Sequence, residues 1–215
     1  MEHAVLFDLD GTLVDSLPDI ATALNHALVD HGLPKAPPEL VRTWIGGGAR
    51  VLIERAVGPD LVDPVLERFR AHYAAAPVVD TIVYEGLAPV LDALAAAGLA
   101  LAVLTNKPHR LAVPICERLL GAWPFVAIAG ARPGEPLKPD PAGALALAAQ
   151  LGVAPARCAL VGDAGTDIAT ARAAGMLAVG VSWGYRPRDE LLAAGADWIA
   201  DSPSQLLGHV QRRVP

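Results

Sequence analysis

The stretch AVLFDLDGT, residues 4–12, decides the fold of this chain. Its first four residues are apolar, as in a parallel β-strand that is covered on both faces. Two aspartates follow directly, and side chains alternate across an extended strand, so Asp8 and Asp10 are expected on one side with Leu9 opposite. The sequence therefore predicts a first strand, residues 4–7, that ends at a ligand-binding edge with two carboxylates in one site.

Similar apolar runs recur along the second part of the chain, and helical patterns separate them. One pattern places Leu87, Val90, Leu91 and Leu94 on one face of a helix, which Gly98 is positioned to end. Alternating strands and helices are typical of a parallel sheet with helices on both faces. We therefore expect an open α/β sheet with further strands at residues 99–104, 126–129, 158–161, 177–181 and 198–200, and further helices near residues 140–151, 167–174 and 187–194.

The interval of residues 16–80 interrupts this alternation. Apolar residues recur there at helical spacing, for example Leu17, Ile20 and Leu24, and no segment has a convincing strand pattern. Loops at the carboxyl edge of an open sheet carry function, so an insert directly after the first strand is expected to cover that edge. The predicted organisation is an α/β core of residues 1–15 and 81–215 with a helical cap of residues 16–80.

The composition argues against several classes of protein. The 215 residues are 53% hydrophobic, which is ample for a packed core, and the formal net charge is −6. There is no run of Lys and Arg to follow a nucleic-acid backbone, no apolar run long enough for a bilayer and no basic signal-like start. We expect a cytoplasmic monomer or homodimer without nucleic-acid or membrane partners, in which Cys116 and Cys158 are buried free thiols.

Three more polar sites come with the later strands. Thr105 and Asn106 follow the strand at residues 99–104, Lys138 lies in a proline-rich segment, and Asp163 follows the strand at residues 158–161, with Asp167 four residues later. Each has an ordinary alternative when taken alone. Thr105 could cap a helix, Lys138 could be a solvated surface charge, and Asp167 could be an acid in the first turn of a helix.

A shared function explains these sites better than separate structural roles. A calcium-binding loop does not fit, because Gly11 is the fourth residue of the run that begins at Asp8 rather than the sixth. Phosphoryl transfer does fit, because it needs a carboxylate nucleophile, a proton shuttle, donors for phosphate oxygens, a cation against their charge and a metal held by acids. The sequence therefore indicates phosphoryl-transfer chemistry at the edge of the sheet.

At this point the chain resembles the haloacid-dehalogenase superfamily over nearly its whole length, and within it the phosphoglycolate phosphatase-like branch. The four motifs of the superfamily correspond to DLDGT at residues 8–12, to Thr105, to Lys138, and to Gly162 and Asp163 with Asp167. The branch is indicated by WIGGGA at residues 44–49 and GVSWGY at residues 180–185. The resemblance implies a Rossmann-like parallel sheet with strand order 3-2-1-4-5 plus an edge strand, and a helical cap inserted after the first strand.

The resemblance also implies a role for each motif residue. Asp8 would be the nucleophile that forms an aspartyl-phosphate, Asp10 the proton shuttle, and Thr105 and Lys138 the groups that hold phosphate oxygens. Mg²⁺ would be bound by Asp8, Asp163 and the backbone carbonyl of Asp10, with Asp167 behind them. Contacts to the substrate would also come from Leu9, Gly11 and Asn106. One departure is Ala164, where relatives commonly have serine.

The expected substrate is a small anionic phosphomonoester, with 2-phosphoglycolate as the best candidate. An acid at position 10 separates the chain from similar dehalogenases and phosphonate hydrolases. In the cap, backbone N–H groups of the turn at Gly47 and the guanidinium of Arg50 are expected to meet the carboxylate of the substrate. A pyrophosphatase, a sugar-phosphate phosphatase or phosphomutase, and an inactive phosphate-binding regulatory protein are the alternatives.

Overall fold

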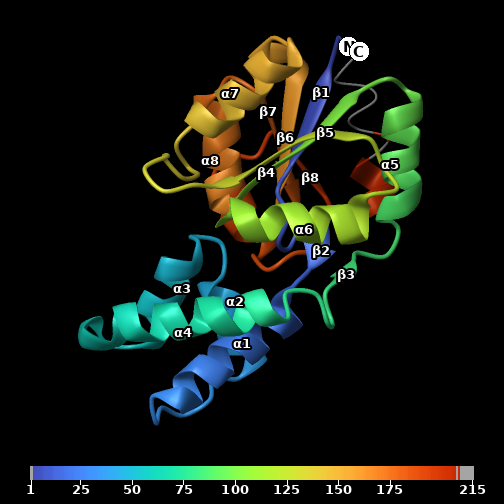
Figure 1. Cartoon of the computed structure of the whole chain (residues 1–215). Coiled ribbons are helices and arrows are strands. Elements are labelled where there is room, and N and C mark those ends of the chain that lie inside the picture. Colours follow the sequence, from blue (N-terminus) through green and yellow to red (C-terminus); the bar gives the residue numbers. More distant parts are fainter. Residues whose placement is uncertain (1, 207, 209–215) are drawn as a thin grey trace.

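The computed structural model describes residues 2–206 and 208, and its centre is a six-stranded sheet in which every strand pair is parallel (Figure 1). The strand order is β5-β4-β1-β6-β7-β8, which confirms the predicted order 3-2-1-4-5 with an added edge strand. The strands are β1 Ala4–Phe7, β4 Ala100–Pro108, β5 Phe125–Ala131, β6 Cys158–Gly162, β7 Leu177–Val181 and β8 Trp198–Ala200.

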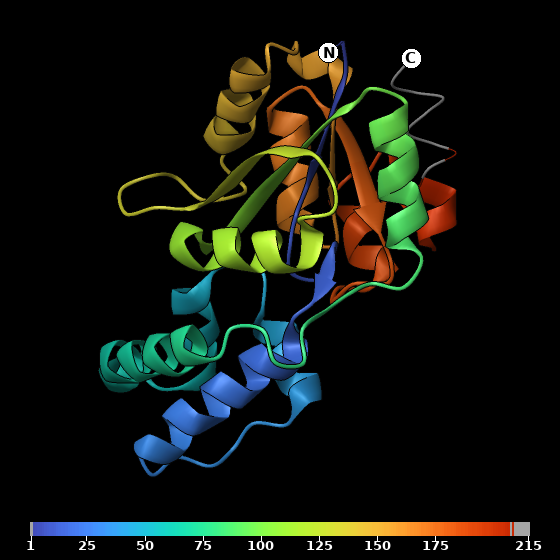
Figure 2. The same ribbon diagram turned by 45° about the vertical axis from the view of Figure 1, so that its right-hand side comes forward.

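Side-chain alternation along β1 explains why helices cover both faces of the sheet. Val5 and Phe7 pack into the hydrophobic cluster that contains residues of α5 and α6, whereas Ala4 and Leu6 pack into the cluster formed with α7, α8 and α9. In Figure 2 the green helix α5 and the gold helix α7 lie on opposite sides of the blue strand β1. These helices are α5 Leu87–Ala96, α6 His109–Leu120, α7 Ala142–Leu151, α8 Gly165–Ala173 and α9 Arg188–Ala193, and a short 3-10 helix, η2, covers Pro155–Arg157.

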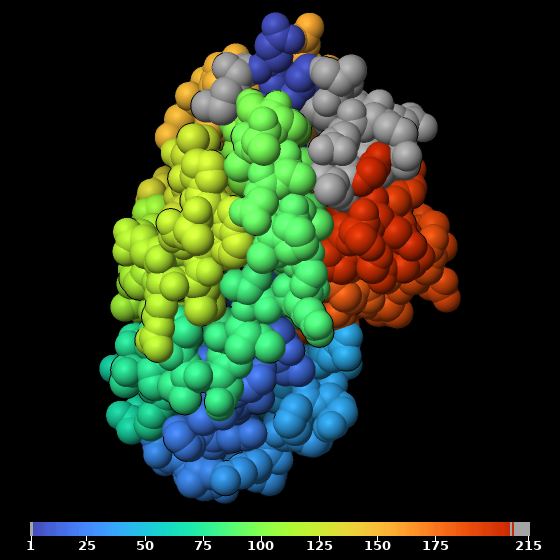
Figure 3. Space-filling view, turned by 90° about the vertical axis from the view of Figure 1, so that its right-hand side faces the viewer, coloured from blue at the N-terminus to red at the C-terminus, as the bar shows by residue number. Residues whose placement is uncertain are grey.

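The insert between β2 and β3 is helical, and it lies beneath the sheet in Figure 1 and packs against the core in Figure 3. β2, Val14–Asp15, and β3, Ile82–Val83, form an antiparallel pair, so the two chain segments that join the insert to the core run side by side. We refer to residues 16–80 as the cap, and this boundary remains a prediction. The cap contains α1 Leu17–Asp30, α2 Pro38–Trp44, α3 Ala49–Ala56, the 3-10 helix η1 Pro59–Leu61, and α4 Val62–Ala75.

A buried carboxylate fastens the first cap helix to the chain that returns to the core. Asp19 of α1 accepts hydrogen bonds from the backbone N–H groups of Val79, Asp80 and Thr81 at 2.9–3.2 Å, and from the Thr81 hydroxyl at 2.5 Å. Burial by itself would raise the pKa of Asp19, but these donors outweigh it and hold the pKa below its ordinary value. Asp19 therefore ties together the two segments through which the cap is attached.

The predicted end of the strand at residue 104 is wrong. The strand predicted for residues 99–104 continues to Pro108, with a shift of register between Thr105 and Pro108, and α6 begins only at His109. No helix starts beside Thr105 and Asn106, so the N–H groups of a helix terminus are not next to them. Helix α6 was not predicted from the sequence, since Pro114 lies inside it and proline normally interrupts a helix.

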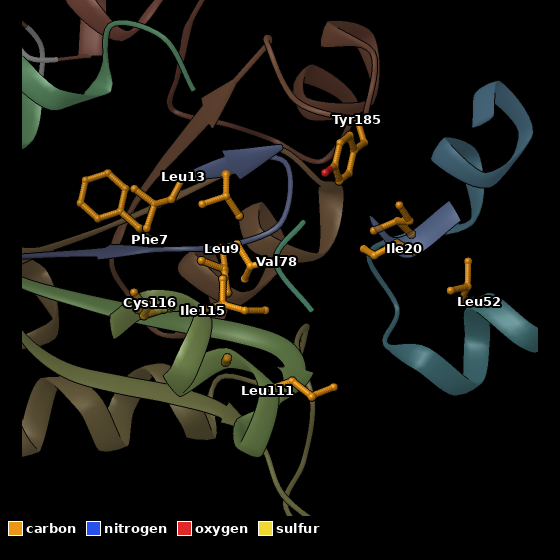
Figure 4. Close-up of a cluster of buried hydrophobic side chains, with 14 of the residues drawn as sticks. Phe7, Leu9, Leu13, Ile20, Leu52, Val78, Leu111, Ile115, Cys116 and Tyr185 are labelled. Carbon is orange, nitrogen blue, oxygen red and sulfur yellow. The ribbon is translucent and has the colours of Figure 1, made fainter. Parts of the chain in front are cut away.

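Two further predictions from the sequence concern membrane-spanning segments and the two cysteines. Within the described part of the chain, no helix is long and apolar enough to cross a membrane. Cys116 and Cys158 are buried and carry free thiols. Figure 4 shows Cys116 and Ile115 of α6 close to Leu9 in the core, which accounts for Cys116 as an apolar packing residue.

Candidate active site

Three buried carboxylates meet where β1 and β6 end. Because Phe7 pairs with Val161, the residues that follow the two strands are neighbours at the same edge. Oxygen atoms of Asp8, Asp163 and Asp167 lie within 4.8 Å of one another. Burial raises the pKa of Asp8 to about 6, and burial together with repulsion from Asp167 and Asp8 raises the pKa of Asp163 to about 8. A cation beside Asp8 and Asp163 would favour their ionised forms.

The arrangement fits a hard divalent metal ion. All its side-chain donors are carboxylate oxygens, the ligand type that such ions prefer. In addition, Asp8 Oδ1 is buried and has no well-aligned hydrogen-bond donor, although the Lys138 ammonium lies 2.9 Å away. The cluster therefore has both the charge and an available ligand atom for a cation.

Asp163 is held in place from two sides. Its Oδ1 accepts a hydrogen bond from the Thr12 hydroxyl at 3.2 Å, and its Oδ2 accepts one from the backbone N–H of Tyr185 at 2.7 Å. Gly11 has φ +86°, and a Cβ atom there would lie 2.4 Å from Asp163 Oδ2. Glycine is thus required at position 11, both for the left-handed backbone and for the close approach of Asp163.

Lys138 is fixed between two of the acids. Its ammonium donates to the Leu104 carbonyl at 3.0 Å and to Asp167 Oδ1 at 2.6 Å, and it lies 2.9 Å from Asp8 Oδ1. Burial favours the neutral amine, but the attraction of Asp167 and Asp8 prevails and raises the pKa of Lys138 above its usual value. The second Asp167 oxygen accepts the N–H of Ala164 at 3.0 Å. Asp167 therefore orients Lys138, which presents a permanent positive charge beside Asp8.

The side chain of Asp10 is bound to a second lysine, Lys107. Its side-chain oxygens lie 2.9 and 3.1 Å from the Lys107 ammonium, and Oδ1 also accepts the Ser16 hydroxyl at 2.5 Å. Lys107 is not among the residues predicted from the sequence. A signal was present, because alternation along an extended strand places residue 107 on the side of Thr105. With its side chain engaged there, Asp10 can contribute to a metal site only through its backbone.

Three other residues predicted from the sequence, Thr105, Asn106 and Leu9, differ in what they contact. The Thr105 hydroxyl accepts the backbone N–H of Lys107 at 3.1 Å. The Asn106 amide donates to the carbonyls of Gly46 in the cap and Lys138 in the core, and its oxygen accepts the N–H of Lys138. Asn106 thereby links the cap to the loop of Lys138. The side chain of Leu9 is fully buried in the core, so this residue can meet a substrate only through its backbone.

A small cavity between core and cap contains the reacting edge. Its volume is about 60 Å³, and it is enclosed partly by apolar side chains such as Ile20 and Leu52 from the cap and Leu111 from α6 (Figure 4). Two cap residues at its wall, Arg70 and Tyr73, were not predicted from the sequence. Its polar lining is completed by Asp8, Asp10, Thr105, Asn106 and Lys107.

The predicted cap residues Gly47 and Arg50 line a different space. They face an outer cavity of about 700 Å³, whose wall also includes Gly48, Arg70 and Asn106 from the boundary of the inner cavity. The Arg50 guanidinium is half-exposed and lies 2.5 Å from Asp63 Oδ1, so it already has a counter-ion. The structure thus brings together the predicted core residues and leaves Arg50 outside the cavity that contains Asp8.

Comparison with known proteins agrees with this architecture. Residues 2–175 match the model of the haloacid dehalogenase-like hydrolase family. A phosphoglycolate phosphatase of Haemophilus influenzae strain 86-028NP is 40% identical, covering 94% of this chain and 95% of that protein. One from Rhodospirillum rubrum is also 40% identical, with 96% and 90% covered.

Solved structures resemble the whole chain as well. The crystal structure of a predicted phosphoglycolate phosphatase from Haemophilus somnus superposes with a TM-score of 0.90 at 35% identity, and 98% of each chain is covered. The family model spans most of the sequence, and the similarity extends over core and cap together. The chain therefore belongs to the haloacid dehalogenase-like hydrolase family.

Proposed function

We propose that this protein is a magnesium-dependent phosphatase that hydrolyses a small phosphomonoester, with 2-phosphoglycolate as the preferred substrate. The observation that carries the proposal is the meeting of Asp8, Lys138 and Asp163 at one sheet edge, with Asp10 in the same cavity. The substrate assignment is supported by the relatives named phosphoglycolate phosphatase, which are 35–40% identical over nearly the full chain.

In the first half-reaction, a carboxylate oxygen of Asp8 attacks phosphorus and the bond from phosphorus to the ester oxygen breaks. Asp10 is paired with Lys107 as a carboxylate in the free protein, takes up a proton with the bound substrate, and donates it to that departing oxygen, so the leaving group departs as an alcohol. Asp8 is well placed as the nucleophile because it is almost completely buried, at 8% exposure, and faces the cavity. The product of this step is an aspartyl-phosphate on Asp8.

In the second half-reaction, Asp10 takes a proton from water while the water oxygen attacks phosphorus. The bond between phosphorus and the Asp8 oxygen breaks, inorganic phosphate forms, and both aspartates return to their starting states. Lys138 and Thr105 bind the phosphate oxygens in both steps, and Lys138 opposes the negative charge of Asp8. One acid–base group therefore serves both half-reactions in turn.

Magnesium would be held by the side chains of Asp8 and Asp163 and by the backbone carbonyl of Asp10. When bound, it supplies positive charge that reduces repulsion between the anionic substrate and the nucleophile. Asp167 would not bind the metal directly, because its two oxygens accept hydrogen bonds from Lys138 and from the Ala164 N–H. The rest of the chemistry rests on the residues of the chain itself.

The size of the inner cavity favours a short leaving group. The inner cavity has a volume of about 60 Å³. A water molecule in such a cavity needs roughly 10–15 Å³, so there is room for only a few water-sized groups. This inner space suits a two-carbon acid, whereas a hexose or a nucleoside would have to extend toward the outer cavity. Specificity must come from groups other than Asp8, Thr105 and Lys138, because these three core residues contact only the phosphoryl group.

The decisive experiment measures phosphate release from a panel of esters with magnesium present. We expect 2-phosphoglycolate to give the highest kcat/KM among 2-phosphoglycolate, p-nitrophenyl phosphate, pyrophosphate and glucose 6-phosphate. If another member exceeds it by about tenfold, a difference of about 1.4 kcal/mol in transition-state stabilisation, the substrate assignment is wrong. Cytoplasmic location and a monomeric or homodimeric state remain predictions from the sequence.

A further inference from the structure

The inner cavity has a second cationic group, distinct from the lysine that faces Asp8. The Lys107 ammonium is buried, and Asp10 is its single charged partner in the described part of the chain. An ammonium carries three N–H donors, and its two hydrogen bonds both end on the Asp10 carboxylate. Lys107 can therefore serve a further anionic acceptor without releasing Asp10.

The aromatic ring of a cap residue, Tyr73, contacts the Lys107 ammonium. Tyr73 of α4 is 2% exposed, and the centre of its ring lies 4.6 Å from the Lys107 ammonium. Its hydroxyl oxygen is buried and has no well-aligned hydrogen-bond partner among the described residues; the Lys107 ammonium is a nearby donor to it, but the hydroxyl proton has no acceptor. A buried hydroxyl without a partner is costly in a folded protein, which suggests that a ligand supplies the acceptor. Burial raises the pKa of Tyr73, so its hydroxyl keeps its proton and remains a donor.

The third element is an arginine that has no counter-ion. Arg70 lies three residues before Tyr73 on α4, is exposed to solvent, and lines both the inner and the outer cavity. Within residues 2–206 and 208 it has no ion-pair or hydrogen-bond partner. Arg68 on the same helix is different, because it is bound to Asp30 at 2.6 Å.

We infer that Lys107, Tyr73 and Arg70 form a second anion subsite that binds a carboxylate of the substrate beside the phosphate ester. The subsite adds one uncompensated positive charge and one free hydroxyl donor to a small, partly apolar cavity, and a carboxylate satisfies both. This inference rests on the proposed phosphatase function and narrows its substrate class to phosphate esters of short hydroxy acids. It also transfers the recognition of the carboxylate from Arg50, which is paired with Asp63, to Arg70.

The test compares two esters with the same carbon skeleton, 2-phosphoglycolate and ethyl phosphate, which lacks the carboxylate. The selectivity is the ratio of their kcat/KM values in the presence of magnesium. We expect Arg70→Gln to lower this ratio about tenfold or more and Tyr73→Phe to lower it severalfold, as for the loss of donors to a charged group. Arg68→Gln is the matched control on the same helix and should leave the ratio unchanged.

Binding provides a readout that does not depend on turnover. In an Asp8→Asn background, calorimetry should show that 2-phosphoglycolate binds more tightly than ethyl phosphate, and that Arg70→Gln removes most of this difference. Thermal unfolding of each variant identifies any that fails to fold, and Tyr73→Phe removes only a hydroxyl without a partner, so it should fold normally.

The outcomes separate this inference from the proposed function. If Arg70→Gln and Tyr73→Phe leave the selectivity and the binding difference intact while the wild type releases phosphate, the subsite is wrong and the phosphatase stands. The subsite is wrong in the same way if Arg50→Gln lowers the selectivity and Arg70→Gln does not. If the wild type hydrolyses neither ester and binds both equally, the function and the subsite are both wrong.

Discussion

The ammonium of Lys107 lies 2.9 and 3.1 Å from the two carboxylate oxygens of Asp10, and both side chains are almost entirely buried. Burial would lower the pKa of Lys107, but Asp10 holds it above its usual value, so the lysine is a permanent cation in the site. Each partner therefore prevents the other from being an unbalanced charge in a poorly solvated place.

The first prediction concerns the coupling of this pair. Lys107→Met and Asp10→Asn should each lower the free energy of unfolding by about 3 kcal/mol, because each leaves one buried charge alone. The double variant removes both charges and should be more stable than the sum of the two losses implies, by about 2 kcal/mol. Urea unfolding of the four proteins at pH 7 measures the coupling. Strictly additive losses would show that the contact contributes nothing to stability.

The second prediction concerns the nucleophile. Asp8→Asn should lack phosphatase activity, because the amide cannot form the aspartyl-phosphate, while the nearly isosteric change preserves the fold. Phosphate release is measured beside circular dichroism and thermal unfolding. Turnover close to that of the wild type, in a preparation free of other phosphatases, would remove Asp8 from the mechanism.

The third prediction concerns the proton shuttle. Asp10→Asn should lower kcat by about 10²–10⁴-fold, the usual loss when a general acid is removed. An ester with an acidic leaving group, such as p-nitrophenyl phosphate, needs less protonation and should suffer a smaller loss in its first step. Equal rates for wild type and variant on 2-phosphoglycolate would place the shuttle elsewhere.

The fourth prediction concerns the metal. Removal of divalent ions with a chelator should abolish activity, and added magnesium should restore it. Asp163→Ala should raise the magnesium concentration needed for half-maximal rate, because the variant has lost one acidic ligand. The control is Asp60→Ala, which changes an exposed acid of the cap. An identical magnesium dependence for Asp163→Ala and wild type would assign the metal to other residues.

The fifth prediction concerns the attachment of the cap. Asp19→Asn should lower the free energy of unfolding at pH 7 by about 2 kcal/mol, since a carboxylate that accepts several hydrogen bonds is replaced by an amide. The pKa of Asp19 is held below its ordinary value of 3.8, so the folded state binds this proton less readily than the unfolded state. The stabilisation is therefore complete above that pH and is lost as the pH falls through the folded-state pKa.

Denaturant unfolding at several pH values tests this sign. The difference in stability between wild type and Asp19→Asn should narrow as the pH falls below 3.8. A difference that stays constant down to about pH 2, well below the ordinary carboxyl pKa, would mean that the Asp19 carboxylate is not the source of the stabilisation.

Local patterns in the sequence were sufficient to predict the parallel sheet and the reacting acids at its edge. Strands β1, β7 and β8 have the predicted limits, because a short apolar run between polar or glycine residues leaves little choice of boundary. The parallel arrangement then places the residues after β1 and β6, Asp8 and Asp163, at one edge. The limits of β4 and the presence of α6 were not predictable in this way, because a shift of register extends the strand and Pro114 obscures the helix.

The sequence by itself determined the α/β class, the helical insert after the first strand and the four motifs at the strand ends, since each depends on periodicity or on residues a few positions apart. Only the tertiary structure decided which cap residues face the core. Arg50 and Arg70 are both arginines on helical segments of the cap, but Asp63 engages the first, while the docking of α4 brings the second to the cavity of Asp8. Tyr73 of α4 likewise lies over Lys107 of β4 only in the folded chain, because contacts between segments far apart in the sequence depend on how the cap and the core fit together.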